Sequence, residues 1–181
     1  MVYTKLHRAV QHPDNKWYLS YLLRQGYDTN ARNKDRKTPL HLAIEYGNVS
    51  AARMLLSHGT IVNAKNIYGE TPLHTACEYG MTAIVYQLMH YGANVNAIDN
   101  VYQTPLHIAV KNNNTKITSI LLKNGALVNR NDAKWRHPLH YAALSGTKEM
   151  IRLLINNGAD ITSKDWYLKT PKDYMRTRLS N

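Results

Sequence analysis

The sequence predicts an all-α fold made of short helical pairs that stack on one another. The first observation is a four-residue phrase, Thr-Pro-Leu-His, that recurs at a fixed interval. Its copies begin at Thr38, Thr71 and Thr104, and variants of it begin at His137 and Thr170. Each copy starts 33 residues after the previous one, and such a period is typical of helical repeat proteins. The second observation is a set of glycines with the same spacing, namely Gly59, Gly92, Gly125 and Gly158.

The segment 35–65 illustrates how one repeat is built. Thr38 can cap a helix through its hydroxyl, and Pro39 suits the first helical position, where its missing N–H costs nothing. Gly47 ends this first helix, whose apolar side is formed by Leu40, Ala43 and Ile44. A second helix follows and ends at Gly59, which supplies a left-handed residue. The inner stripe of this second helix is Ala51, Ala52, Leu55 and Leu56.

The period also divides the chain into repeats. A helical pair this short cannot bury both of its faces, so neighbouring pairs must stack. We expect one repeat domain over residues 1–181, with an N-terminal capping repeat at 1–33, full repeats at 34–66, 67–99, 100–132 and 133–165, and a partial C-terminal cap at 166–181. Because His7 lies 34 residues before His41, the first repeat has one additional residue, which we place near His12-Pro13-Asp14.

These patterns resemble the ankyrin repeat family over nearly the whole chain. The resemblance rests on the tetrads, on the paired leucines of the second helices, and on the runs 92–96 and 125–129. It implies two antiparallel helices and a projecting, hairpin-like finger in each repeat, with a concave face formed by the fingers and the first helices. It further implies that the tetrad histidines bond to backbone and to the neighbouring threonine hydroxyl, which ties the repeats together; these are His7, His41, His74, His107 and His140.

Composition narrows the setting in which the protein acts. The chain has 23 basic and 12 acidic residues, which gives a net charge of +11. The single cysteine, Cys77, excludes an internal disulfide and favours an intracellular protein. The segment 1–10 lacks the apolar core of a signal peptide, and no apolar run is long enough to cross a membrane. We therefore expect a cytoplasmic or nuclear protein that does not bind membranes.

Chemistry-bearing residues do not form a catalytic pattern. The sequence has no glycine-rich phosphate loop, nucleophile elbow or paired carboxylates. A metal site needs ligands that converge on one point, whereas stacked repeats hold the tetrad histidines about one repeat apart. Cys77 occupies a slot filled by Ile44 and Val110 in other repeats, so we expect a buried, inert thiol. The sequence predicts no catalytic residue, no cofactor and no metal.

The fingers carry the functional prediction. In the ankyrin family the residue two before the tetrad is usually glycine, because the turn there favours a positive φ, and only Gly69 follows this rule. The other four repeats have Arg36, Tyr102, Trp135 and Leu168. A bulky residue in the left-handed conformation costs on the order of 1 kcal/mol. Either the turn avoids positive φ, or the side chains form a functional surface that is worth this cost.

A partner-binding surface is predicted from these residues and their neighbours, because exposed Tyr, Trp and Arg dominate binding hot spots. Fingers and first helices contribute Arg36, Tyr46, Tyr68, Tyr79, Tyr102, Lys134, Trp135, Arg136, Tyr141 and Trp166. The alternative is that the fingertip aromatics only pack on one another. The positive charge is spread over both ends and the fingers without a continuous stripe, which favours a solvated surface over a nucleic-acid groove.

The predicted function is a non-catalytic, monomeric scaffold that binds another protein. The Asn-, Ile-, Lys- and Tyr-rich repeats resemble ankyrin proteins of large DNA viruses, poxviruses especially. This implies a protein of an infected host cell that interferes with NF-κB control or ubiquitin-ligase recruitment. Many poxviral ankyrin proteins end in an F-box-like segment, and the residues after Met175 are too few to form one, so we expect a stand-alone binder or a truncated copy. The alternative is a basic module for nucleic acid or anionic surfaces, which a steep salt dependence of binding would reveal.

Two local departures bear on stability. His137 replaces the capping threonine, which we expect to weaken that helix start by roughly 1 kcal/mol. Asn113 replaces the glycine of the turn between helices, for which Gly47, Gly80 and Gly146 are the counterparts. This change is mild, because asparagine tolerates the left-handed region.

Overall fold

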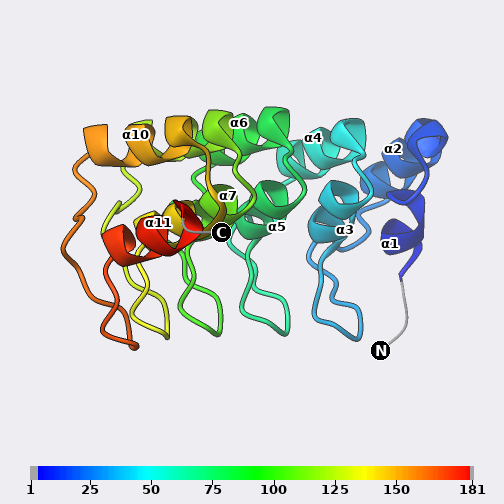
Figure 1. Ribbon diagram of the computed structural model, residues 1–181. Helices are drawn as coiled ribbons and strands as arrows, with labels where there is room; N and C mark the ends of the chain where they lie inside the picture. Colours follow the sequence, from blue (N-terminus) through cyan, green and yellow to red (C-terminus); the bar gives the residue numbers. More distant parts are fainter. Residues whose placement is uncertain (1–3, 180–181) are drawn as a thin grey trace. The chain divides into compact units, whose positions relative to one another are not determined.

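The computed structural model describes residues 4–179, and within this range the chain forms eleven α-helices, one 3-10 helix and no β-strand (Figure 1). The prediction of an all-α fold is therefore confirmed. The helices belong to two compact units, one ending at Asn94 and the other beginning at Val95.

The first unit contains three helical pairs and a connecting 3-10 helix. Its elements are α1 (Lys5–Ala9), η1 (Pro13–Asn15), α2 (Lys16–Arg24), α3 (Pro39–Glu45), α4 (Val49–Ser57), α5 (Pro72–Glu78) and α6 (Thr82–His90). The first helices pack in one layer, α1 on α3 and α3 on α5, and the second helices pack in another, α2 on α4 and α4 on α6. The 3-10 helix η1 lies where the sequence placed the additional residue of the first repeat.

The second unit repeats this two-layer arrangement. Its elements are α7 (Pro105–Lys111), α8 (Thr115–Lys123), α9 (Pro138–Ser145), α10 (Lys148–Asn156) and α11 (Pro171–Leu179). Helix α9 packs against both α7 and α11, while α10 packs against α8. In both units long loops project from the N-terminal ends of the first helices (Figure 1). These loops are the fingers, and the surface that the fingers and first helices make in each unit is called the finger face.

Leucines of the tetrads anchor the core. Leu40 and Leu73 in the first unit, and Leu106 and Leu139 in the second, are fully buried. The second helices bury most of the apolar stripe that their spacing predicted, including Leu55, Leu88, Leu121 and Leu154. Ile155, which the spacing also placed on the inner stripe of α10, is 43% exposed, so the prediction was wrong at that position. Burial of a leucine side chain stabilises a fold by about 1.5–3 kcal/mol, so the 33-residue spacing of these leucines gives each repeat an equivalent apolar anchor.

Asparagine side chains connect successive repeats just after the C-terminal ends of the second helices. Asn63 accepts a hydrogen bond from the backbone amide of Asn94 over 2.8 Å and donates one to the carbonyl of Gly92 over 3.2 Å. In the second unit, Asn129 makes the same two bonds with Asp160 and Gly158, over 2.8 and 2.9 Å. These bonds satisfy backbone groups in the turns that follow the second helices.

One asparagine or aspartate closes the tip of every finger. The side-chain Oδ1 accepts hydrogen bonds from the amides two and four residues later, as Asp132 does from Lys134 over 2.8 Å and from Arg136 over 2.9 Å. The five residues in this role are Asn33, Asn66, Asp99, Asp132 and Asp165. This series was not predicted, although its 33-residue spacing is visible in the sequence.

The closed tips keep bulky residues in the left-handed region. The φ angles are 56° at Arg36, 63° at Tyr102, 57° at Trp135 and 59° at Leu168, compared with 78° at Gly69. Of the two options that the sequence left open, a turn that avoids positive φ is thus wrong. Such strain persists only where surrounding bonds over-determine the backbone, and the Asn and Asp bonds at the tips provide them.

The turns between first and second helices differ from the prediction at one point. Gly47, Gly80 and Asn113 have positive φ angles of 66°, 66° and 52°. Gly146 was expected to match them, but it has a φ of −73° and ψ of 162°. Helix α9 continues one residue further than its counterparts, to Ser145, and the amide of Thr147 instead donates to the side chain of Asn113 over 3.0 Å. This prediction for Gly146 was therefore wrong.

Candidate functional site on the finger faces

The tetrad histidines are structural. In the first unit, the backbone N–H of Thr38 donates to Nδ1 of His41 over 3.2 Å, and the threonine hydroxyl lies 2.9 Å from the same atom. Nε2 of His41 lies 3.2 Å from the carbonyl oxygen of Glu70 in the next finger. Because an amide can only donate and a carbonyl can only accept, the ring is neutral and carries its proton on Nε2. The predicted role of these rings in tying repeats together is confirmed.

Burial supports the neutral form of these rings. It lowers the pKa of His41 and of His107 to about 4, and the hydrogen bonds to Glu70 and Arg136 only partly oppose it. At His137, where threonine was expected, the amide still donates to Nδ1 of His140 over 3.0 Å. His137 still occupies the N-cap position of α9, but the buried Nδ1 of its ring has no hydrogen-bond partner.

Cys77 and the other potential metal ligands show no shared site. Cys77 is completely buried as a free thiol, and burial raises its pKa. Across residues 4–179, no three His, Cys, Asp or Glu side chains gather as a metal site would require. In the same part of the chain, no helix has the length and apolar character to span a membrane.

In the first unit the predicted binding residues are exposed but separate. Arg36 and Tyr68 lie at fingertips, whereas Tyr46 and Tyr79 cap the C-terminal ends of α3 and α5. No ring contact joins these four side chains within the described part of the unit. Lys37 and Glu45, the chain neighbours of Arg36 and Tyr46, form an ion pair.

The ion pair shifts the pKa values of Lys37 and of the neighbouring Tyr79. Burial lowers the pKa of Lys37, but the hydrogen bond and charge of Glu45 outweigh it and raise the pKa. The pKa of Tyr79 is raised by burial and by the charge of Glu45. Lys37 therefore stays protonated and paired with Glu45 of α3. Its charge is largely neutralised by this pair and contributes little to binding a partner.

In the second unit the structure brings most of the predicted residues together. The indole rings of Trp135 and Trp166 lie 6.4 Å apart at neighbouring fingertips, with exposed fractions of 60% and 66%. The two tips are joined by the amide of Trp166, which donates to the carbonyl of Lys134 over 3.0 Å. Tyr102 is exposed on the preceding tip, but it makes no ring contact with the described residues of this unit.

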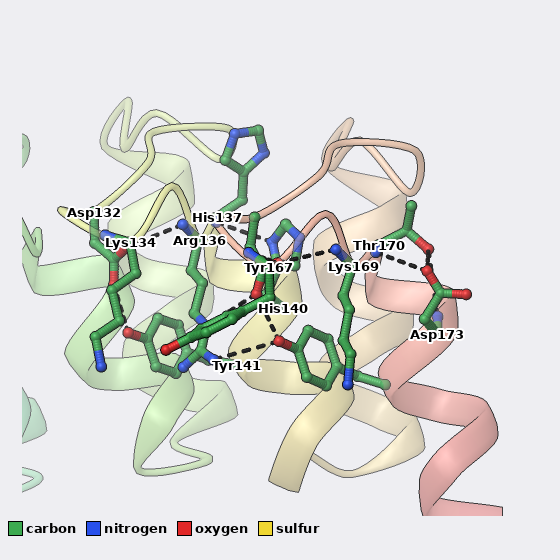
Figure 2. A network of polar contacts seen from close by, with 12 residues as sticks. Asp132, Lys134, Arg136, His137, His140, Tyr141, Tyr167, Lys169, Thr170 and Asp173 are labelled. Carbon is green, nitrogen blue, oxygen red and sulfur yellow. Dashed lines mark hydrogen bonds and ion pairs between the residues drawn. The ribbon is translucent and has the colours of Figure 1, made fainter.

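Arg136 is the centre of a polar network between two fingers and two first helices (Figure 2). Its Nε donates to Oδ2 of Asp165 over 3.3 Å, and Nη2 donates to the hydroxyl of Tyr174 over 3.3 Å. The guanidinium carbon lies 5.8 Å from the ring centre of Tyr141, 5.8 Å from that of Tyr167 and 5.7 Å from that of Tyr174. These three rings are called the tyrosine cage.

Tyr141, which was predicted as a partner-binding residue, is half-buried and makes internal bonds. Its hydroxyl donates to Oδ2 of Asp132 and accepts from Nε2 of Gln103 over 2.9 Å. Burial and the carboxylate of Asp132 raise the pKa of Tyr141 to about 12. Burial alone raises the pKa of Asp132, but the bonds from Tyr141 and from the finger amides outweigh it and lower the pKa. Tyr141 is partly exposed, whereas its hydroxyl is used within the fold.

The network partners of Arg136 were not predicted from the sequence. Asp165, Tyr167 and Tyr174 were not among the predicted site residues, and neither was Asp132. One signal was available, since the Asp132–Tyr141 pair and the Asp165–Tyr174 pair share a separation of nine residues and recur after 33. The pairing itself could not be deduced, because it depends on how each finger folds back along its helix.

The stacked helical pairs, the fingers and the exposed aromatic side chains define a repeat protein of the protein-binding class. The sequence model described as Ankyrin repeats (3 copies) matches residues 6–99 and 92–165. The chain belongs to the ankyrin repeat family, whose members are generally non-catalytic interaction scaffolds.

A viral relative is also found. The chain is similar to the ankyrin repeat protein FPV223 of fowlpox virus (strain NVSL), with 39% identity over 51 residues. This match covers 28% of the present chain and 36% of the fowlpox protein, so it spans about a third of that relative. It agrees with the resemblance to poxviral ankyrin proteins that the composition of the repeats indicated.

Proposed function

We propose that this protein is a binding scaffold that grips a partner protein on its finger faces and thereby modulates host signalling during viral infection. The observation that carries the proposal is the exposed Trp135–Trp166 pair beside Arg136. Trp, Tyr and Arg are the residue types enriched in binding hot spots. The backbone of Trp135 is held at a strained but over-determined tip, and a finger that is already ordered lowers the entropic cost of binding.

The residues proposed to contact the partner are the ten predicted from the sequence. Those of the second unit form the better-defined part, because Trp135, Arg136 and Trp166 are held near one another. Arg36, Tyr46, Tyr68 and Tyr79 offer separate exposed contacts in the first unit. The fowlpox relative and the repeat composition support a viral setting, and interference with NF-κB control or ubiquitin-ligase recruitment is the proposed outcome.

The test is affinity capture from avian and mammalian host-cell lysates with mass spectrometry, using the wild-type chain and the Trp135→Ala/Tyr102→Ala variant. A protein retained by the wild type and lost by the variant is the expected result. Each substitution should weaken binding by more than about 1 kcal/mol, or roughly fivefold or more. If every captured protein binds both forms equally well, the finger-face proposal is wrong.

Basic nucleic-acid binding is the competing function, and the net charge of +11 is its support. The same lysates treated with nuclease separate the two. A partner that disappears after nuclease treatment, or that is lost steeply between low and physiological salt, indicates a nucleic-acid complex. A partner that survives both treatments indicates a protein interface.

A further inference from the structure

The guanidinium of Arg136 is fixed by its contacts, but not all of its N–H groups have an acceptor within the fold. Nε and Nη2 bond to Asp165 and Tyr174, and the tyrosine cage surrounds the group. Nη1 has no hydrogen-bond acceptor among the side chains and backbone groups that the structure describes. The side chain remains 18% exposed, so N–H groups are left for an acceptor from solvent. A planar guanidinium with free N–H groups is suited to bidentate binding of a carboxylate.

The aspartates nearest to Arg136 keep their negative charge, and Asp165 is ion-paired with Arg136, but their oxygens are already occupied by hydrogen bonds and do not take up its remaining N–H groups. Oδ1 of Asp132 accepts two finger amides and Oδ2 accepts the hydroxyl of Tyr141. Oδ1 of Asp165 likewise accepts the amides of Tyr167 and Lys169, over 2.9 and 3.0 Å. Its Oδ2 accepts the hydroxyl of Tyr174 over 2.6 Å as well as Arg136.

Two lysines add positive charge beside the cage. Lys134 and Lys169 are exposed, and neither forms an ion pair with any residue that the structure describes. Nζ of Lys169 lies 5.6 Å from the ring centre of Tyr174. Figure 2 shows that both lysines extend along the same face as Arg136 and Tyr141, one on each side of them. Arg136 and the two lysines therefore form a positively charged site beside the aromatic rings of the tyrosine cage.

An apolar contact surface adjoins this charge. Trp135 precedes Arg136 in the chain, and Trp166 is bonded through its amide to the carbonyl of Lys134. Their rings lie 6.4 Å apart and are mostly exposed. A ligand that places a carboxylate at Arg136 can thus place a neighbouring apolar side chain against the indoles.

We infer that the finger face of the second unit recognises an acidic segment of a partner protein, with a carboxylate bound by Arg136 between Lys134 and Lys169 and an adjacent apolar side chain on Trp135 and Trp166. This inference rests on the proposed function, because it specifies the chemistry of the partner that the finger face would bind. The occupant is an Asp- and Glu-rich peptide stretch that carries one large apolar residue.

Charge distribution favours a peptide over a nucleic acid. From Val95 onward the sequence has thirteen Lys and Arg residues against six Asp and Glu. Several of these cations, including Lys116, Lys123, Lys148 and Arg152, lie on the second helices α8 and α10, away from the fingers. Binding of a single-stranded nucleic acid uses a basic groove that follows the backbone together with successive stacking platforms. The cage instead offers a few cations around one aromatic pair.

The experiment measures the binding of a fluorescein-labelled peptide to the full chain by fluorescence anisotropy. The probe has about ten residues, all Asp and Glu except for one central Trp, and its matched control replaces every Asp and Glu with Asn and Gln. We expect saturable binding of the acidic probe and about tenfold or greater weakening with the amide control, as the loss of a charge-assisted pair implies. Equal binding of the two peptides would overturn the inference.

Charge-reversal variants locate the site. Lys134→Glu/Lys169→Glu is expected to weaken binding of the acidic probe by about tenfold or more. Lys116→Glu/Lys123→Glu makes the same change in net charge on exposed positions of α8 and is expected to change binding by no more than about twofold, as only the long-range field differs. Equal losses in the two variants, or no loss in either, would contradict a site at the cage. Circular dichroism of each variant verifies that the helices are retained.

Further outcomes distinguish a failure of the acidic-peptide inference from a failure of the proposed protein-binding function. A single-stranded oligonucleotide of equal charge that displaces the peptide and binds more tightly would replace the acidic-peptide site with a nucleic-acid site. A captured protein that depends on Trp135 and Tyr102 but binds Lys134→Glu/Lys169→Glu normally would overturn the acidic specificity and leave the proposed function standing. Lysine-dependent peptide binding without any captured protein would support the chemistry and count against the proposed function.

Discussion

The hydroxyl of Tyr174 donates a hydrogen bond to Oδ2 of Asp165 over 2.6 Å. The same pairing joins Tyr141 to Asp132 one repeat earlier. Each hydroxyl also accepts a donor from the preceding finger, Gln103 for Tyr141 and Arg136 for Tyr174. A single tyrosine hydroxyl therefore ties a first helix to its own finger and to the finger before it.

Removal of one such hydroxyl tests this connection. Tyr141→Phe leaves Oδ2 of Asp132 and Nε2 of Gln103 without a common partner, so we expect the free energy of unfolding to fall by about 1–2 kcal/mol. The pKa of Asp132 should rise as well, because the tyrosine hydroxyl helps to lower it. Chemical denaturation measures the first effect and NMR titration the second. Tyr46→Phe, at an exposed ring, is the control and should stay within about 0.5 kcal/mol of wild type.

The strained fingertips predict an unusual gain from glycine. Leu168 has a φ of 59° and its side chain is 74% exposed, so its removal loses little packing. We expect Leu168→Gly to be about 0.5–1 kcal/mol more stable than Leu168→Ala, because glycine relieves the left-handed strain and alanine does not. Thermal denaturation of both variants measures the difference. An alanine variant as stable as the glycine variant would mean that the tip has no strain to relieve.

A buried hydroxyl in α8 offers a second stabilising change. Thr118 is completely buried, and its Oγ1 has no hydrogen-bond partner. Thr118→Val keeps the shape and removes the unpaired polar atom, so the free energy of unfolding should rise by about 1 kcal/mol. Valine already occupies the equivalent position of another repeat, at Val85. Thr118→Ser keeps the hydroxyl and loses a methyl group, and it should be destabilising by about 1 kcal/mol; loss of stability in the valine variant would contradict the account.

The buried histidines predict a loss of stability in mild acid. The pKa of His41 and of His107 is lowered to about 4 in the folded protein, compared with about 6.5 in an unfolded chain. Between these values the unfolded state binds more protons, so stability falls as the pH drops from about 6.5 to 4. The loss amounts to as much as about 1.4 kcal/mol per pH unit for each ring. Denaturant midpoints across this range measure it, and an NMR titration showing either ring protonated near pH 6.5 would refute it.

The sequence predicted the repeated helices well because their signals are local. A tetrad fixes the start of each first helix within four residues, and glycines such as Gly59 and Gly92 mark the ends of the second helices. The turn at Gly146 was missed because the conformation there depends on the extra residue of α9 and on a bond from Thr147 to Asn113. Those two residues are 34 positions apart, beyond the reach of a local pattern.

The candidate site was predicted only in part, for a similar reason. Exposure of Trp135, Tyr102 and Trp166 follows from their place at the fingertips, which the period determines. The cage around Arg136 depends on contacts with Asp165, Tyr167 and Tyr174, which lie 29 to 38 residues further along. Such contacts are set by the stacking of one repeat on the next, and one repeat read alone contains no sign of them.

The neutral histidine rings bear on how the repeats resist mechanical unfolding. The Nε2–H of His41 bonds to the carbonyl of Glu70, and that of His107 to the carbonyl of Arg136, each in the next finger. A finger peeled away by a protein-unfolding machine would leave the ring behind it with a buried N–H that lacks an acceptor, at a cost of about 1–3 kcal/mol. A half-opened repeat is therefore disfavoured, so within each unit the repeats should yield in whole steps.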